Sequence, residues 1–151
     1  MKHNKIFFHD IGVSASLLRR KDLKDFLLTL FNKEGARLKR VDIIFCTDEN
    51  LLSLNAEFLN HHYYTDTMSF ILSNPEEPII GEIYISIDRI RSNAKHYKKL
   101  YQNELCRVIL HGCLHLCGYT DKPKKAADKM EALQEKYLKL FDVSRETQIG
   151  G

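Results

Sequence analysis

The chain reads MSFILSNPEEPIIGEIYIS from Met68 to Ser86. Two β-rich segments, residues 68–72 and 79–86, flank a turn in which two prolines and an asparagine exclude both a helix and a strand ladder. Ile83 and Ile85 fall on one face of the second segment because side chains alternate along a strand. The stretch therefore predicts an antiparallel hairpin.

Strand and helix patterns alternate before this hairpin, and only helical patterns follow it. Strands are predicted at residues 5–10 and 41–46, and helices at residues 22–32 and 48–59. Three more helices are predicted, at residues 88–98, at residues 103–117 and from residue 123 onward. This order predicts an α+β fold with a mixed four-stranded sheet packed with about five helices. We expect a single metal-dependent hydrolase domain over residues 1–143 and a flexible tail over residues 144–151.

Length and composition indicate an ordinary soluble globular protein. The chain has 151 residues, of which 44% are hydrophobic and 28% charged. No apolar run approaches the ~20 residues of a membrane helix, and the N-terminus has no signal-peptide core. We therefore expect a cytoplasmic protein without membrane contact. The net charge of +3 is compatible with a polyanionic partner without requiring one.

The segment HGCLHLCGYTD, residues 111–121, predicts a metal site at the end of a helix in the C-terminal half. His111 and His115 are four residues apart, so on a helix both rings emerge from one face. Gly118 can end the helix in a left-handed conformation, and the turn can bring Asp121 back toward the rings. Three protein ligands and one open position for water are typical of catalytic zinc, so we expect one divalent transition metal, zinc.

Gly112 occupies the position after the first histidine. Zinc peptidases with two helical histidines carry glutamate there as general base, so glycine argues against peptidase chemistry. Glycine also costs ~1 kcal/mol relative to alanine inside a helix. We infer that another element or the substrate approaches the backbone closely at this position.

Three of the four cysteines, Cys106, Cys113 and Cys117, lie on the same predicted helix. Cys113 and Cys117 are each two residues, about 200°, from a histidine, so they face away from the metal. We interpret them as buried thiols.

Three blocks of sequence resemble one family, the YbeY-type endoribonucleases that act as bacterial rRNA maturation factors. They are LN with TDTMSF at residues 54–55 and 65–70, GEIYIS at residues 81–86, and HGCLHLCGY at residues 111–119. The resemblance implies a mixed sheet with several helices. It also implies a single-strand-specific, metal-dependent endoribonuclease of rRNA maturation and ribosome quality control. The implied partners are ribosomal RNA and the ribosome, with no DNA substrate.

The chain departs from the family at the third metal ligand. Aligned without a gap, Asp121 replaces the third histidine, and a carboxylate is an acceptable zinc ligand. With a gap, Lys122 replaces that histidine, and Asp121 only orients one of the other two. Asp121 stands in both alignments, as a ligand in the first and as a support in the second.

A second departure concerns a family arginine, whose position is Leu59 here. If that arginine contacts phosphate, this chain must use another cation. His61, His62 and the lysines after Asp121 are the candidates.

The catalytic group is expected to be a metal-bound water, because a bound metal lowers the pKa of water. Asp66 and Glu82, in the matching blocks, are candidates for proton transfer. A structural role is the simpler interpretation of both, as a turn or cap carboxylate and as a solvent-facing strand residue. The competing functions are a metallopeptidase-like hydrolase and a non-catalytic, ribosome-associated metal-binding module.

Overall fold

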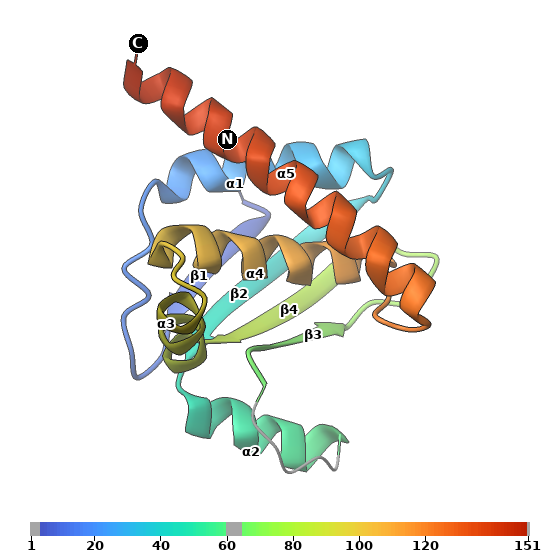
Figure 1. Cartoon of the computed structure of the whole chain (residues 1–151). Helices are drawn as coiled ribbons and strands as arrows, with labels where there is room; N and C mark the ends of the chain where they lie inside the picture. The colour runs from blue at the N-terminus through green and yellow to red at the C-terminus, as the bar shows by residue number, and fades with distance from the viewer. Residues whose placement is uncertain (1–3, 60–64, 151) are drawn as a thin grey trace.

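The computed structural model describes residues 4–59 and 65–150, with side chains left out at 58–59 and 143–150. This part of the chain forms four strands and five helices, whose arrangement is drawn in Figure 1. The elements in order are β1 (Ile6–Asp10), α1 (Arg20–Lys33), β2 (Leu38–Cys46), α2 (Asp48–Leu59), β3 (Thr67–Ile71), β4 (Ile79–Ser86), α3 (Ile87–His96), α4 (Tyr101–Leu116) and α5 (Lys124–Gly150).

The four strands form one mixed sheet in the order β1-β2-β4-β3. β1 pairs with β2 and β2 with β4 in parallel, whereas β3 and β4 form the predicted antiparallel hairpin. Within the hairpin Ser69 lies opposite Ile83. Because β3 is last in the strand order, it is an edge strand of the sheet, and it lines the cavity described below.

The two faces of the sheet carry cores of different size. Val41, Ile43, Ile83 and Ile85 point into the main core with α1, α3, α4 and α5. The residues between them point to the other face, where α2 covers a small cluster around Leu51. Figure 1 shows α4 lying across the first face, with α5 crossing over it and α2 on the opposite side.

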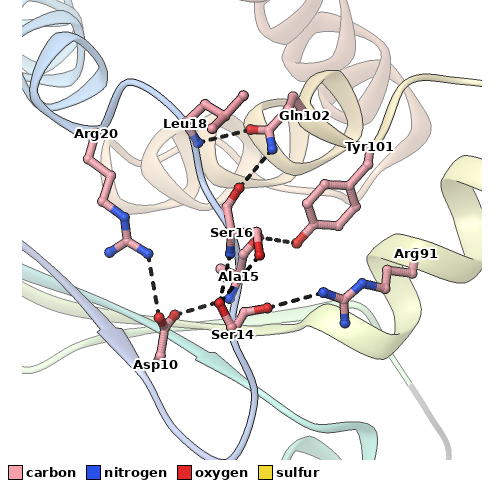
Figure 2. A network of polar contacts seen from close by, with 9 residues as sticks. All are labelled: Asp10, Ser14, Ala15, Ser16, Leu18, Arg20, Arg91, Tyr101 and Gln102. Carbon is pink, nitrogen blue, oxygen red and sulfur yellow. Dashed lines mark hydrogen bonds and ion pairs between the residues drawn. The ribbon is translucent and has the colours of Figure 1, made fainter.

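The N-terminal end of α4 is fixed by the loop between β1 and α1 (Figure 2). The Tyr101 hydroxyl donates to the Ala15 carbonyl at 2.5 Å, and the Gln102 amide donates to the Ser16 carbonyl at 2.8 Å. The Gln102 carbonyl accepts from the Leu18 backbone N–H at 3.1 Å. These contacts define where the helix that carries both histidines begins.

The middle of α4 packs directly on β4 through a glycine. A Cβ at Gly112 would lie 2.7 Å from Cγ2 of Ile83, closer than van der Waals contact permits. One turn later, Leu116 covers Gly81, where a Cβ would lie 2.8 Å from its Cδ1. The predicted close approach at Gly112 is therefore confirmed, and the approaching element is a strand of the sheet.

The predicted α+β class, mixed sheet and five helices are confirmed, with element ends displaced by a few residues. The backbone of α5 remains helical to Gly150, so most of the predicted tail continues a helix. Its flexibility, like the extent of the hydrolase domain, stays a prediction. Among the described residues no helix is both long and apolar enough to cross a membrane.

Candidate metal centre

The two histidines of α4 present the same ring nitrogen to one point in space. Nε2 of His111 lies 3.1 Å from Nε2 of His115, and the ring centroids are 4.6 Å apart. The side chains are 28% and 24% exposed, so the rings are walled by protein and open on one side. The four-residue spacing therefore converges as predicted.

The other nitrogen of each ring bonds to protein. Nδ1 of His115 lies 3.0 Å from the backbone carbonyl oxygen of Tyr119, and Nδ1 of His111 lies 2.7 Å from Oε1 of Gln134. A carbonyl oxygen only accepts, so Nδ1 of His115 carries the proton in this contact. Such a bond leaves the opposite nitrogen able to bind a cation.

Sequence reasoning missed Gln134. Met130, Leu133 and Tyr137 follow helical spacing along the sequence of the last helix and mark its buried side. Gln134 is four residues after Met130 and is only 7% exposed. A polar residue within that apolar stripe was the available signal.

The turn after α4 follows from Gly118. This residue has φ of +107°, a conformation that glycine adopts without steric cost. The Gly118 N–H donates to the His115 carbonyl at 3.0 Å, and the Tyr119 N–H donates to the Leu114 carbonyl at 3.1 Å. This pair of bonds is a Schellman motif, and it places the Tyr119 carbonyl against His115.

Glu34, at the end of α1, forms hydrogen bonds to this turn and to α5. Its carboxylate accepts from the Tyr119 hydroxyl at 2.6 Å and from the Tyr137 hydroxyl at 2.5 Å. The hydrogen bond to Glu34 raises the pKa of Tyr119 to about 12, so this hydroxyl remains a donor at neutral pH. The contact connects α1, the turn and α5 behind the histidines.

Asp121 completes the group from the loop. Its carboxylate oxygens lie 3.1 Å from Nε2 of His115 and 3.7 Å from Nε2 of His111. One donor atom from each of the three residues lies within 4.8 Å of the others. The structure thus brings together all three predicted ligands.

The arrangement suits one small cation. Two nitrogens bound at ~2.0–2.1 Å in a tetrahedral arrangement stand about 3.3 Å apart, close to the 3.1 Å between the two Nε2 atoms. Two imidazoles with bare nitrogens and one carboxylate form a donor set that zinc and other divalent transition metals accept. The residues therefore fit a metal ion, whose identity the donor set leaves open.

A cavity of about 680 Å³ opens beside this group. It is lined by residues 65–71, by the two histidines and Leu116, and by the loop from Tyr119 to Asp121. One wall is therefore the edge strand β3, and the other is the C-terminal half of α4. The cavity follows β3 over its whole length, from Thr67 to Ile71.

The two candidate carboxylates have different positions. Asp66 lines the cavity, and burial raises its pKa, an effect that the nearby His111 opposes in part. Glu82 alternates with Gly81 and Ile83, so it points to the opposite face of the sheet, where it accepts from the Tyr84 hydroxyl at 2.9 Å. The structure therefore brings Asp66, and not Glu82, to the histidines.

The predicted substitutes for the family arginine are only partly described. The Leu59 side chain, His61 and His62 lie outside the described residues. Among the lysines after Asp121, Lys124 pairs with Asp128 at 3.0 Å. Lys122 and Lys125 are exposed.

The cysteines of α4 lie behind the histidine face, as predicted. Cys113 is fully buried and Cys117 half-buried, and both are free thiols. Burial raises the pKa of Cys117 to about 12 and that of Cys113 well above its usual value. Both thiols are therefore protonated at neutral pH in the metal-free protein.

The sequence model of the family described as Endoribonuclease YbeY matches residues 13–142. The chain belongs to the YbeY family. It is 40% identical over 140 residues to the Endoribonuclease YbeY of Cytophaga hutchinsonii, covering 93% of this chain and 98% of that protein. It is 41% identical over 134 residues to that of Porphyromonas gingivalis, covering 89% and 88%.

The fold agrees with a solved structure. A Thermotoga maritima protein, determined in solution, superposes with a TM-score of 0.67 at 28% identity, over 95% of this chain and 93% of that one. The resemblance to YbeY-type endoribonucleases is thus confirmed. Two of its three sequence blocks line the cavity, with residues 65–70 on and before β3 and residues 111–119 on α4 and its turn.

Proposed function

We propose that this chain is a metal-dependent endoribonuclease that cuts single-stranded ribosomal RNA during rRNA maturation and ribosome quality control in the cytoplasm. His111, His115 and Asp121 would hold one divalent ion, with zinc as the expected metal. The observation that carries the proposal is the convergence of these three side chains beside an open cavity, in a chain of the YbeY family. DNA is not an expected substrate.

The histidines and the loop carboxylate divide the work of binding. The rings are held from behind through Nδ1, so they present Nε2 without rearrangement. Asp121, which is 60% exposed, contributes negative charge from the solvent side. A divalent metal bound there supplies a Lewis acid for a phosphoryl oxygen and lowers the pKa of water toward ~7.

We assign proton transfer to Asp66. It lies in the wall of the same cavity, and its backbone is fixed because its carbonyl accepts from the Ser86 N–H at 2.9 Å. A carboxyl group with a raised pKa beside the substrate can hold or release a proton closer to neutral pH than an exposed one. Asp66→Asn should lower the cleavage rate at least about 100-fold, the usual scale of acid–base catalysis, and leave the metal content unchanged. Loss of metal in the folded variant would show that Asp66 supports the ligands instead.

The peptidase alternative is disfavoured by packing as well as by sequence. A glutamate at residue 112 would drive its Cβ into Ile83, so α4 could not keep its distance from β4. The general base of helical zinc peptidases therefore has no place in this chain.

The decisive experiment is a cleavage assay with matched substrates. The zinc-loaded protein is incubated with labelled single-stranded rRNA fragments, the same sequences as duplexes, single-stranded DNA and an unstructured peptide. We expect cleavage of single-stranded RNA only, and its loss in His115→Ala and after chelation. Metal binding without RNA cleavage, including on ribosomal subunits, would favour the non-catalytic module. Peptide cleavage that requires His115 would favour the peptidase.

A further inference from the structure

Gln134 is a buried residue of α5, the helix that crosses α4 (Figure 1), and its side-chain amide contacts one residue on each of these helices. Its Oε1 is 2.7 Å from Nδ1 of His111, and its Nε2 is 3.1 Å from Oε2 of Glu135. A glutamine amide can be turned by 180°, which would exchange its donor and its acceptor. The direction of these hydrogen bonds therefore depends on what fixes the amide.

Fixed charge on Glu135 sets that direction. Its Oε2 also accepts from the Arg107 guanidinium on α4, which carries only donors. An ionised carboxylate held by an arginine can only accept, so the NH₂ group of Gln134 must face Glu135. Its carbonyl oxygen then faces His111 and can only accept.

The proton on His111 follows from this chain of donors and acceptors. Because Oε1 of Gln134 accepts, Nδ1 of His111 carries the proton, and neutral His111 has a bare Nε2. Nδ1 of His115 also carries a proton, because it lies 3.0 Å from the Tyr119 backbone carbonyl, which can only accept. One histidine is thus oriented by main chain and the other by a side chain that can be replaced.

We propose that Gln134 is a positioning residue that fixes His111 as the Nδ1–H tautomer, with its direction set by Glu135 and Arg107. The role of Gln134 in metal binding rests on the proposed function. The tautomer of His111 does not, because it can be measured in the metal-free protein. A metal ligand must present a lone pair, so the opposite tautomer of His111 would turn an N–H toward the site.

The direct test is long-range ¹H–¹⁵N NMR of the metal-free protein, which identifies the protonated nitrogen of each imidazole. The spectrum is recorded near pH 8.5, above the ordinary imidazole pKa of about 6.5. We expect His111 as Nδ1–H in the native chain and in Gln134→Glu, which keeps an acceptor. In Gln134→Leu we expect a mixture or the Nε2–H form. His115 should retain its Nδ1–H and serves as an internal control, and exposed Lys136→Ala is the matched variant on α5.

A second variant does not disturb the buried position. The Glu135 side chain is 41% exposed, and Glu135→Lys replaces an obligate acceptor with an obligate donor. The Gln134 amide should then reverse, and His111 should change to Nε2–H. An unchanged Nδ1–H form of His111 in the folded Glu135→Lys and Gln134→Leu variants would overturn the proposal.

Metal affinity separates this proposal from the proposed function. Chelator competition should show binding weakened about 10–100-fold in Gln134→Leu and restored in Gln134→Glu, the range for residues that orient a ligand. If His115→Ala loses the metal and Gln134→Leu does not, the positioning role fails and the metal site stands. If the native chain binds no metal and the tautomer changes as expected, the metal function fails and the positioning role of Gln134 stands.

Discussion

His111 and His115 are held from behind by buried partners, whereas Asp121 reaches the same point from an exposed loop. The histidine side chains are 28% and 24% exposed, and the Asp121 side chain is 60% exposed. Each histidine has its Nδ1 bonded to α5 or to the turn. Asp121 has no comparable support among the contacts described: its carboxylate lies only against the two rings.

The two histidines are therefore placed by folding alone, whereas Asp121 can adjust its position. α4 is positioned by its packing on β4 and by the Schellman turn, so its two nitrogens are ready before a cation arrives. The exposed loop position of Asp121 constrains the type of ligand less than the two positions on α4 do. That freedom is consistent with the ungapped alignment, in which a carboxylate stands where the family has an imidazole.

Removing a helical histidine should have the largest effect. His115→Ala takes away a preformed nitrogen that nothing nearby replaces, so we expect metal affinity to fall at least about 1000-fold, beyond the range for orienting residues. Elemental analysis after reconstitution should give about one equivalent for the native chain and less than about a tenth for the variant. His96→Ala, which removes an exposed imidazole from α3, is the control. Full metal content in the folded His115→Ala variant would contradict the site.

Changing the loop ligand should have a smaller effect. Asp121→Ala should weaken metal binding at least about 10-fold, with two nitrogens still in place, and Thr120→Ala should not. Asp121→His should retain binding, because imidazole suits zinc and the exposed loop has room for it. If a metal-loaded structure places the Asp121 carboxylate beyond ~3.5 Å from the ion, with water in its place, Asp121 is a support and not a ligand.

Disturbing the packing between α4 and β4 should affect both histidines and the loop that carries Asp121, because α4 positions all three. Gly112→Ala improves helix propensity by ~1 kcal/mol, but overpacking a core costs ~1–3 kcal/mol. Overpacking should prevail because a Cβ would lie 2.7 Å from Cγ2 of Ile83, an atom close to the strand backbone. We expect a net loss of up to about 2 kcal/mol in urea unfolding and a few-fold loss of metal affinity.

The control for this substitution is Gly81→Ala, whose Cβ would meet the flexible end of Leu116 at 2.8 Å and the Phe70 carbonyl oxygen at 3.3 Å. It should cost less, because the atom in closest contact can move. The double variant Gly112→Ala with Ile83→Ala should recover the metal affinity, because the obstructing atom is gone. Equal stability of Gly112→Ala and the native chain would show that β4 yields easily at this contact.

Sequence spacing was sufficient where the chemistry is local. The convergence of His111 and His115, the stop at Gly118 and the return of Asp121 all depend on one helix and one turn. The demand for a small residue at Gly112 was also visible, although not the identity of Ile83 as the neighbour. These features follow from helical periodicity and from glycine conformation.

What sequence reasoning missed depends on how distant elements pack. Gln134 meets His111 only because α5 crosses α4, which no local pattern specifies. β2 begins at Leu38, before the predicted residue 41, because Leu38 and Arg40 pair with Ile79 and Ile80 on β4 across a register shift. The position of Glu82 does not depend on distant packing. Side chains alternate along a strand, so Glu82 lies on the face of the sheet opposite to Ile83.

The smallest effect on the metal is expected behind the histidine face. Replacing Cys113 and Cys117 together by alanine should leave the metal content unchanged, because both thiols lie on the opposite side of α4. Loss of packed sulfur should lower the unfolding free energy by about 1 kcal/mol for each buried site. Cys113 is fully buried and its pKa is raised, so Ellman's reagent should label it in the native chain only as fast as the chain unfolds. The half-buried Cys117, whose pKa burial raises to about 12, should react slowly. Two outcomes would contradict this assignment: metal loss from a folded double variant, or immediate labelling of both thiols. Either would mean that the cysteine face of α4, and not the face opposite it, is turned toward the metal.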